Sequence, residues 1–405
     1  MKARPTILFV ADAVTLAHLA RPAALAQRLD AEKFDVILAC DSRYKAFLDH
    51  LPFPTRHLGS MSSERFLESA AKGRPLYDTR TLRNYVRDDL ALLQSVQPEA
   101  VVGDHRLSLS TSARVAGVPY LGVINAYWSP YTATRSLPLP ELPFNRWLGT
   151  SLAESLFRLV WPLASAYHAL PLNRVRRDYG LPSLGNDWFS AYTDADRTLY
   201  ADAIELVPTQ ALPSTHSYLG PILWSPAVAL PPWWDDLPTD RPVIYATMGS
   251  SGRPDLLELV LKALADLPVT VVATTAAKPL QAAPPNARLI DYAPGDQLAA
   301  RADMMICNGG SLTVYQSLAA GKPLLGIASH MDQHLSMSYV EKAGVGTLLR
   351  SEELTSTKLR ETVHQLLAND LAQRRAQALA ISIAAYAPAE RLGKILEEIT
   401  ARVKH

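Results

Sequence analysis

Cysteine is scarce in this chain of 405 residues, which contains only Cys40 and Cys307. Each ends a short apolar run and they lie far apart, so we interpret them as buried side chains in a reducing compartment. They indicate neither a disulfide framework nor a thiolate metal site. A charge excess of one sign is also lacking, because 40 Lys and Arg balance 39 Asp and Glu and the formal net charge is +1. This balance excludes broad electrostatic binding of nucleic acid.

Long apolar runs are missing as well. The run Thr6–Ala11 follows Lys2 and Arg4, but Asp12 interrupts it before it reaches the roughly 7–15 residues of a signal-peptide core. The stretch 152–170 contains charged side chains and falls short of the roughly 20 apolar residues of a membrane span. We therefore expect a cytoplasmic protein without a transmembrane span, and we leave peripheral membrane contact open.

Short apolar runs alternate with helical spacing in both halves of the chain. The first series of runs is Thr6–Ala11, Val36–Cys40, Ala100–Gly103 and Tyr120–Ile124. The second series is Val243–Thr247, Val269–Ala273, Ala287–Ile290, Met304–Cys307 and Leu324–Ile327. Such alternation predicts an α/β fold with parallel sheets and crossover helices, and a chain of this length predicts two domains.

Proline marks the boundary between the two series. Residues 207–242 are dense in proline, which excludes a regular helix there. We accordingly expect an N-terminal domain over 1–215, a C-terminal domain over 216–385 and a last helix within 386–405. Residues 125–185 of the first domain are rich in aromatic side chains and proline.

A glycine turn lies in the second series. The run Met304–Cys307 is followed by Asn308, Gly309, Gly310, Ser311, Leu312 and Thr313, after which helical spacing begins. A strand, a glycine turn and a helix start expose backbone N–H groups that bind phosphate. Beyond the next strand, Leu324–Ile327, the pair Asp332 and Gln333 offers a carboxylate and an amide to the adjacent hydroxyls of a sugar.

These residues resemble a known family. The run Asn-Gly-Gly-Ser-Leu-Thr-x-x-Gln-x-Leu-Ala-Ala-Gly-Lys-Pro, followed by Asp-Gln, is similar to the donor-binding signature of nucleotide-sugar glycosyltransferases. That family includes the plant UDP-glycosyltransferases and bacterial macrolide and glycolipid glycosyltransferases. The resemblance implies the GT-B fold, in which two Rossmann-like domains face each other across a cleft and the last helix crosses back to the N-terminal domain. It also implies a nucleotide-diphosphate sugar as co-substrate, with no cofactor and no metal.

The resemblance assigns two catalytic residues. His18 follows the first strand, where the family carries its general base, although Ala17 replaces the usual glycine. Asp104 ends a neighbouring strand, emerges on the same sheet edge and matches the aspartate that orients this base. Asp12 is the rival base, because some bacterial relatives use a carboxylate from this loop, and His105 is a further neighbour.

The resemblance also assigns donor-binding residues in the second domain. The residues that would contact the diphosphate are Ser250, Asn308, Gly310, Ser311, Leu312 and Thr313. Tyr292 and Ala293 would contact the nucleobase, and Gln316 would contact the ribose. Asp332 and Gln333 would contact the transferred sugar. Two positions depart from the family, since Asn308 replaces a usual His and Gln316 a usual ribose-binding Glu. A 2′-deoxyribose tolerates the second change, so thymidine and uridine donors both stay open.

A different motif, Asp194-Ala195-Asp196, imitates a metal-binding Asp-x-Asp, but it lacks supporting ligands and is interpreted as a loop.

The sequence thus predicts a metal-independent, inverting glycosyltransferase. His18, oriented by Asp104, would deprotonate an acceptor hydroxyl, and residues 125–185 would bind an apolar or amphipathic acceptor, a natural product or a lipid. Two alternatives remain: a nucleotide-sugar 2-epimerase, and a non-catalytic nucleotide-sugar-binding subunit suggested by Asn308 and Gln316.

Overall fold

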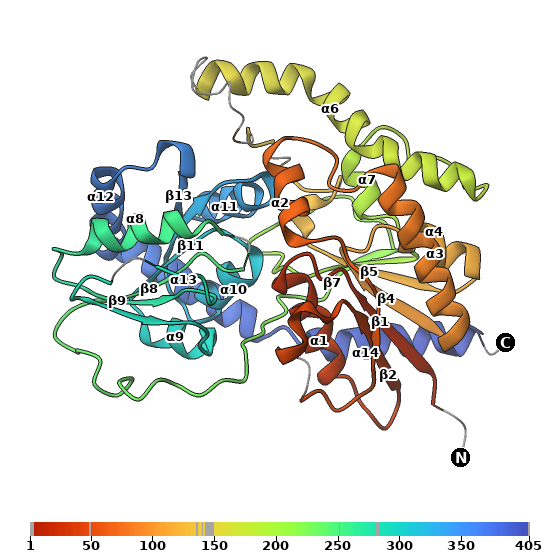
Figure 1. The fold of residues 1–405 in the computed structure, drawn as a ribbon, viewed down its shortest axis with the longest axis horizontal. Coiled ribbons are helices and arrows are strands. Elements are labelled where there is room, and N and C mark those ends of the chain that lie inside the picture. Colours follow the sequence, from red (N-terminus) through yellow and green to blue (C-terminus); the bar gives the residue numbers. More distant parts are fainter. Residues whose placement is uncertain are drawn as a thin grey trace. The chain divides into compact units, whose positions relative to one another are not determined.

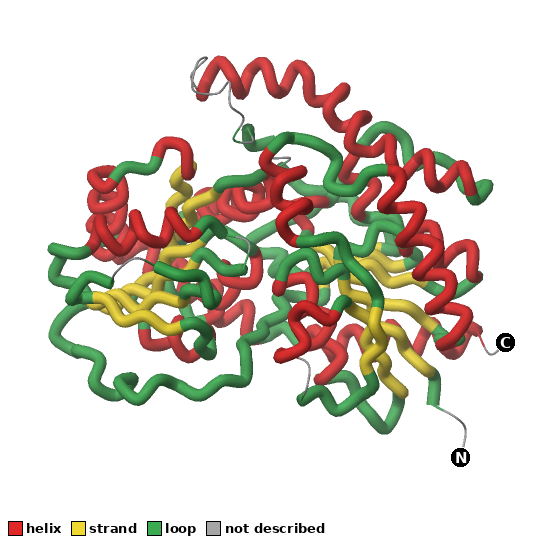
Figure 2. Tube along the Cα trace, in the orientation of Figure 1, coloured by secondary structure: helices red, strands yellow, loops and turns green. Residues whose placement is uncertain are grey.

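The computed structural model describes residues 4–47, 50–134, 137–139, 141, 150–250, 252–280 and 283–403. The chain divides into two compact units (Figure 1). The first comprises residues 1–135, 144–222 and 386–405, and the second comprises 136–143 and 223–385. Each unit is a parallel sheet flanked by helices (Figure 2). The expected α/β class with two parallel sheets is therefore confirmed.

The sheet of the first unit has the strand order β3-β2-β1-β4-β5-β6-β7, with every pair parallel. Its strands are β1 (Thr6–Ala11), β2 (Asp35–Cys40), β3 (Thr55–His57), β4 (Ala100–Asp104), β5 (Tyr120–Ile124), β6 (Arg197–Tyr200) and β7 (His216–Tyr218). The central strands are apolar because helices cover both faces of a parallel sheet. Ala11 lies opposite Asp104 in the register, so β1 and β4 end at the same edge.

The helices of the first unit are α1 (Leu16–Gln27), α2 (Ser63–Ala71), α3 (Thr79–Val96), α4 (Leu109–Ala116), α6 (Thr150–Asp178), α7 (Trp188–Tyr192) and α14 (Pro388–Val403), with the 3-10 turns η1 (Ser42–Phe47) and η2 (Ala126–Trp128). Helix α6 runs for 29 residues through Pro162 and Pro171, each of which removes a helical hydrogen bond. Helix α14 packs on α1 and β4, and its Leu392 and Leu396 are fully buried.

The sheet of the second unit has the order β10-β9-β8-β11-β12-β13 and is also parallel. Its strands are β8 (Val243–Thr247), β9 (Thr270–Thr274), β10 (Ala287–Ile290), β11 (Met304–Cys307), β12 (Leu324–Ala328) and β13 (Gly346–Arg350). Its helices are α8 (Pro254–Leu264), α9 (Gly295–Arg301), α10 (Ser311–Ala319), α11 (Met331–Ala343), α12 (Ser356–Leu367) and α13 (Asp370–Ala384), with the turn η3 (Ser351–Glu353).

A short segment from the first half of the sequence belongs to the second unit. Leu139 is buried there, and its carbonyl accepts a hydrogen bond of 2.9 Å from Nη1 of Arg350. The hydroxyl of Ser351 donates to Oε2 of Glu141 at 2.6 Å. The second unit is thus built from two separate stretches of the chain. Cys40 and Cys307 are both buried and form no disulfide, in agreement with their interpretation as apolar side chains.

Candidate active site

His18 and Asp104 lie together at the carboxyl edge of the first sheet. His18 is in the first turn of α1, and its Nδ1 lies 2.9 Å from Oδ1 of Asp104, the last residue of β4. An ionised carboxylate only accepts hydrogen bonds, so Nδ1 carries the proton and Nε2 keeps its lone pair. The side chain of His18 is 19% exposed and that of Asp104 is 1% exposed. The pair therefore combines an accessible ring with a buried carboxylate that orients it.

Arg21, which was not predicted from the sequence, forms an ion pair with the carboxylate of Asp104. Its Nε lies 2.7 Å from Oδ2 of Asp104 and its Nη2 lies 2.8 Å from Oδ1, in a bidentate arrangement. Its Nη1 donates to Oδ1 of Asn125 at 2.6 Å. Burial alone would raise the pKa of Asp104, but the charge of Arg21 and the hydrogen bond from His18 outweigh burial, and this pKa lies below its ordinary value. Asp104 is thus held ionised.

The rival base, Asp12, is fully buried. It accepts hydrogen bonds from the hydroxyls of Tyr77 at 2.6 Å and Tyr85 at 3.3 Å, and it lies 3.8 Å from Nη1 of Arg106. Both of its oxygens are engaged, and a substrate hydroxyl has no access to them. The geometry favours His18 over Asp12 as the group that meets an acceptor.

His105 follows Asp104 in the left-handed region, at φ 57°, and its ring centroid lies 4.2 Å from that of His18. Burial, together with the charges of His18 and Arg21, lowers the pKa of His105 well below its ordinary value. The His105 ring is therefore neutral near neutral pH. It packs against His18 without adding a charge beside it.

An aromatic cluster continues from His105 along this edge. It consists of Trp128 in η2, Trp161 in α6, and Trp188, Phe189 and Tyr192 in α7. The ring of Tyr192 lies 5.7 Å from that of His105. Residues 125–185 were expected to build the acceptor pocket; the aromatic cluster draws on that segment and extends to α7.

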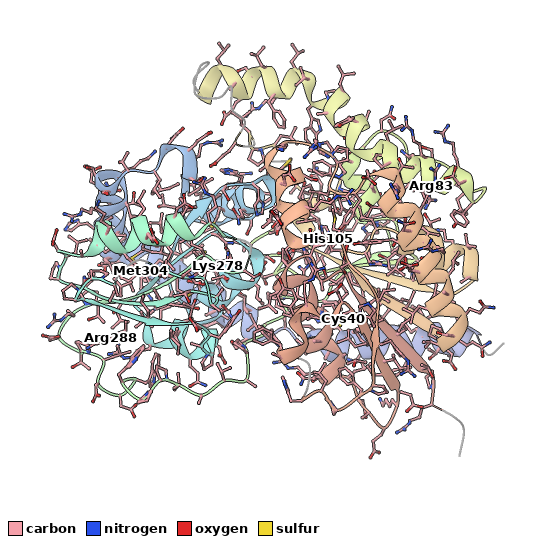
Figure 3. All side chains as sticks on the ribbon, in the orientation of Figure 1. Cys40, Arg83, His105, Lys278, Arg288 and Met304 are labelled. Atoms are coloured by element: carbon pink, nitrogen blue, oxygen red, sulfur yellow. The ribbon has the colours of Figure 1, made fainter. Side chains whose placement is uncertain are left out.

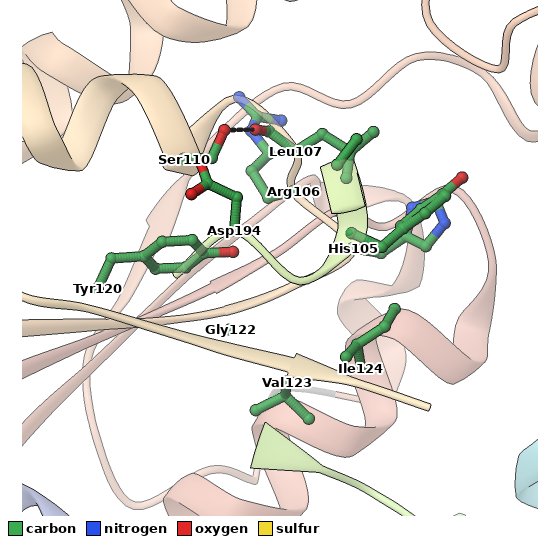
Figure 4. A pocket seen from close by; sticks show the side chains of 11 residues that line it. His105, Arg106, Leu107, Ser110, Tyr120, Gly122, Val123, Ile124 and Asp194 are labelled. Atoms are coloured by element: carbon green, nitrogen blue, oxygen red, sulfur yellow. Dashed lines mark hydrogen bonds between the residues drawn. The ribbon is translucent and has the colours of Figure 1, made fainter. Parts of the chain in front are cut away.

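A small cavity is lined in part by His105 (Figure 4). It is lined by His105 and Tyr192 at one end and by Ser110, Tyr120 and Asp194 at the other. Asp194 forms ion pairs with Arg114 and Arg176, each at 2.7 Å, so its carboxylate has structural partners within the first unit. Among the described residues no group of His, Cys, Asp and Glu side chains is arranged to hold a metal ion.

In the second unit, two strand-to-helix turns meet at the carboxyl edge of the sheet. Strands β8 and β11 pair with Thr247 opposite Cys307, and a Cβ built on Gly249 would lie 3.6 Å from Nδ2 of Asn308. The Ser250 turn and the Asn308 turn are therefore neighbours. The predicted diphosphate residues of the two turns are brought together within one unit.

The Asn308 turn leads into the open start of α10. Gly309 has φ 80°, and a Cβ there would lie 2.6 Å from Cγ of Met337, so this position requires glycine. Gly310 is the N-cap residue and brings no capping side chain, while Oδ1 of Asn308 accepts from its N–H at 3.1 Å. A helix start of this kind attracts anions.

Lys278, labelled in Figure 3, was not predicted but lies at the Ser250 turn. Its Nζ donates to the carbonyl of Gly252 at 2.6 Å and lies 3.5 Å from that of Ser250. Burial lowers the pKa of this amine. It is a cation beside the proposed diphosphate residues, and only the three-dimensional arrangement reveals it.

Gln316, one of the two positions that depart from the family, lies against Gly295. Nε2 of Gln316 donates to the carbonyl of Trp224 at 2.8 Å, and a Cβ on Gly295 would lie 2.8 Å from that nitrogen. Gly295 thus makes room for Gln316, whose amide holds the linker before β8. This contact of Gln316 with the linker was not predicted from the sequence.

We expect Gln316→Glu to destabilise the second unit. A carboxylate cannot donate to the carbonyl of Trp224, and it would place two acceptors against each other. The cost should be about 1–3 kcal/mol, measured by chemical denaturation. Gln297→Glu, on the exposed side of α9, introduces the same charge change as a control. Equal stability of the two variants would contradict the role given to Gln316.

The remaining predicted donor residues lie near the ends of β10 and β12. The Tyr292 hydroxyl donates to the carbonyl of Ala276 at 3.3 Å, and Ala293 is buried. Asp332 is in the first turn of α11 and is partly exposed. Gln333 is fully buried; its Oε1 accepts from the N–H of Ser329 at 2.9 Å, and its Nε2 has no hydrogen-bond partner among the described residues.

Comparisons with known proteins give consistent findings. Residues 258–399 match the family described as the C-terminal domain of erythromycin biosynthesis protein CIII-like proteins. The chain is 52% identical over 378 residues to a PGL/p-HBAD biosynthesis rhamnosyltransferase of Mycobacterium tuberculosis, covering 93% of this chain and 84% of the relative. It is 51% identical to a PGL/p-HBAD biosynthesis glycosyltransferase of the same species, covering 93% and 88%. An inactive PGL/p-HBAD biosynthesis glycosyltransferase of Mycobacterium bovis is 53% identical over 261 residues, covering 64% and 71%.

Solved structures resemble the whole chain. The calicheamicin glycosyltransferase CalG4 gives a TM-score of 0.72 at 18% identity, covering 99% of both chains. The spinosyn rhamnosyltransferase SpnG complexed with thymidine diphosphate gives 0.70 at 18% identity, covering 98% of this chain and 100% of the other. At these identities the likeness shows a shared fold.

Proposed function

Because this chain belongs to the GT-B glycosyltransferase family that includes the mycobacterial PGL/p-HBAD enzymes, we propose that it transfers a sugar from a nucleoside-diphosphate donor to a hydroxyl of a glycolipid precursor, with inversion at the anomeric carbon. The observation that carries the mechanism is the His18–Asp104 pair. Its buried carboxylate fixes the protonated nitrogen and leaves the other nitrogen as a base.

The proposed step is a single displacement. Nε2 of His18 takes the proton of the acceptor hydroxyl while the acceptor oxygen forms a bond to the anomeric carbon. The bond from that carbon to the diphosphate oxygen breaks, and the nucleoside diphosphate leaves with the electron pair. Asp104 stabilises the imidazolium that results. The open start of α10 and the Ser250 turn would receive the diphosphate charge.

Inversion is tested on the product. Nuclear magnetic resonance of the isolated glycoside should show the anomeric configuration opposite to that of the donor. Retention would contradict a single displacement.

A thymidine-diphosphate sugar is the donor that we propose. In many family members a Glu at the Gln316 position accepts from the ribose; here the amide of Gln316 is bound to Trp224, and a 2′-deoxyribose would lose less from this change. The spinosyn rhamnosyltransferase SpnG, which has the same fold, has been solved in complex with thymidine diphosphate. This chain is 52% identical to a relative named a rhamnosyltransferase and 51% identical to one named only a glycosyltransferase. The transferred sugar therefore has to be identified by experiment. Calorimetry should show tighter binding of thymidine diphosphate than of uridine diphosphate, and the reverse order would contradict this choice.

We also propose that no divalent metal takes part. The donor phosphates would meet a helix start, backbone amides and the amine of Lys278, which can balance their charge without a cation. Addition of EDTA should leave the initial rate unchanged. A loss of activity that manganese restores would contradict this expectation.

The rival function is a donor-binding subunit without turnover, and one similar protein is indeed named an inactive glycosyltransferase. The His18–Asp104 pair favours an active enzyme, because a subunit without turnover has no need of a base and its orienting carboxylate.

A 2-epimerase would need further acid and base carboxylates at the sugar, beyond the single Asp332. It would convert the nucleotide sugar into its C2 epimer without an acceptor, whereas a transferase releases nucleoside diphosphate as it glycosylates an acceptor.

A further inference from the structure

Helix α6 carries a large apolar face exposed to solvent. The exposed side chains on it are Leu152, Leu156, Leu159, Val160, Leu163, Tyr167 and Leu170. Leu159 is 77% exposed and Leu163 is 76% exposed, values typical of charged surface residues. Spacings of three and four residues place this set on one side of the helix. An apolar stripe of this length is unusual on a protein surface and marks an interaction site.

The opposite side of α6 holds the helix on the first unit. Trp161 is buried and packs against Trp188 and Phe189. The hydroxyl of Ser165 donates to the carbonyl of Asn186 at 3.0 Å, and the ring of His168 stacks on that of Trp188 at 4.1 Å. The exposed stripe is therefore not a core face that has failed to pack, since α6 already has a buried face.

Positive charge extends the stripe. Arg174 and Arg177 follow Leu170 at spacings of four and three, and both are exposed. Glu154 is the one acidic residue between 150 and 177, and Asp178 is bound to Arg83 at 2.7 Å. Neither Arg174 nor Arg177 has an ion-pair partner among the residues that the structure describes. The face thus presents leucines and then cations, which matches the apolar and anionic layers of a lipid surface.

We propose that this face of α6 docks the protein on an anionic lipid bilayer. The leucines enter the boundary between headgroups and acyl chains, and Arg174 and Arg177 meet lipid phosphates. Within the described chain no helix is long and apolar enough to cross a bilayer, so the contact lies in the plane of the surface. The inference rests on α6 alone and does not depend on the identity of the donor or the acceptor.

Co-sedimentation with vesicles tests this proposal. The full chain should bind vesicles of phosphatidylcholine and phosphatidylglycerol, and bind more weakly to phosphatidylcholine alone or in high salt. Leu159→Glu combined with Leu163→Glu should lower binding at least about tenfold, because two leucines no longer leave water. Ile381→Glu in α13, also 76% exposed, is the matched control and should bind as the wild type does. Arg174→Glu with Arg177→Glu should lower binding about fivefold per charge.

Three results would overturn the proposal. The first is that the wild-type protein does not sediment with anionic vesicles. The second is that the Leu159/Leu163 double variant sediments with them as much as the wild type does. The third is that light scattering shows a dimer for the wild type and a monomer for this variant. The last would make the face an interface between copies. Circular dichroism verifies that the variant is folded. Sugar transfer to a water-soluble acceptor, measured on the wild type without vesicles, tests the proposed function separately, so a failure of docking and a failure of the proposed function are distinguished.

Discussion

Replacing His18 by alanine should lower the rate of sugar transfer by about 10²–10⁴-fold, the range typical for loss of a general base. The accessible nitrogen of His18 is the one that the structure leaves for an acceptor proton, while Asp12 is buried and engaged with Tyr77 and Tyr85. Donor affinity should change little, because the proposed donor residues belong to the second unit. Steady-state kinetics and calorimetry on the same sample measure both quantities.

Asp104→Asn should act in the same direction but more weakly, since it disturbs the orientation of the ring and the stability of the imidazolium without removing the base. A His18→Ala variant with near wild-type turnover would contradict the assignment. The base would then be sought at Asp12, by Asp12→Asn.

Replacing Arg21 by methionine should have the second large effect. It leaves the buried Asp104 without its bidentate partner, and breaking a buried ion pair costs about 3–5 kcal/mol. Without the charge of Arg21, burial should raise the pKa of Asp104, which then loses its negative charge at a higher pH. Activity on the acid side should therefore be lost at a higher pH than in the wild type.

The pH profile separates this role of Arg21 from simple structural support. A variant that is merely less stable would melt earlier but lose activity at the same pH as the wild type, and that result would contradict the role proposed. Arg21→Lys keeps the charge without the planar fork and should shift the profile less. Combining Arg21→Met with Asp104→Asn removes the unpaired charge and should restore part of the stability.

The free energy of unfolding of the wild type should depend on pH through the ionisation of Asp104. Because its pKa is depressed in the folded protein, its contribution is fully present above the unfolded value of about 3.9 and is lost as the pH falls through the lower folded value. Denaturation measured across the acid range should show this loss, and the contribution should be missing in Asp104→Asn.

The central part of the fold could be predicted because its strands are continuous apolar runs covered on both faces. Thr6–Ala11, Tyr120–Ile124 and Met304–Cys307 have the bounds that the pattern gave. Strand β3 escaped prediction because its three residues are exposed at the sheet edge and carry no apolar signal. Helix α6 escaped because Pro162 and Pro171 interrupt its pattern, although tertiary packing keeps it helical.

The site was predictable to the extent that it depends on strand ends. His18 and Asp104 follow neighbouring parallel strands, and this placement, together with the family resemblance, suggested their meeting. Arg21 was not predictable, since an arginine in a helix is usually exposed and here it is buried by a partner distant in sequence. The contact of Gln316 with Gly295 and Trp224 depends on how the linker folds back, which no local pattern encodes.

One measurement tests the central claim most directly: release of nucleoside diphosphate from a thymidine-diphosphate sugar, with and without a water-soluble hydroxylated acceptor, in wild type and His18→Ala. We expect the wild type to release nucleoside diphosphate only when the acceptor is present, with one glycoside formed per diphosphate released. The His18→Ala variant should release almost no diphosphate although it still binds the donor. Acceptor-independent release, or equal glycoside formation by both proteins, would contradict the central claim.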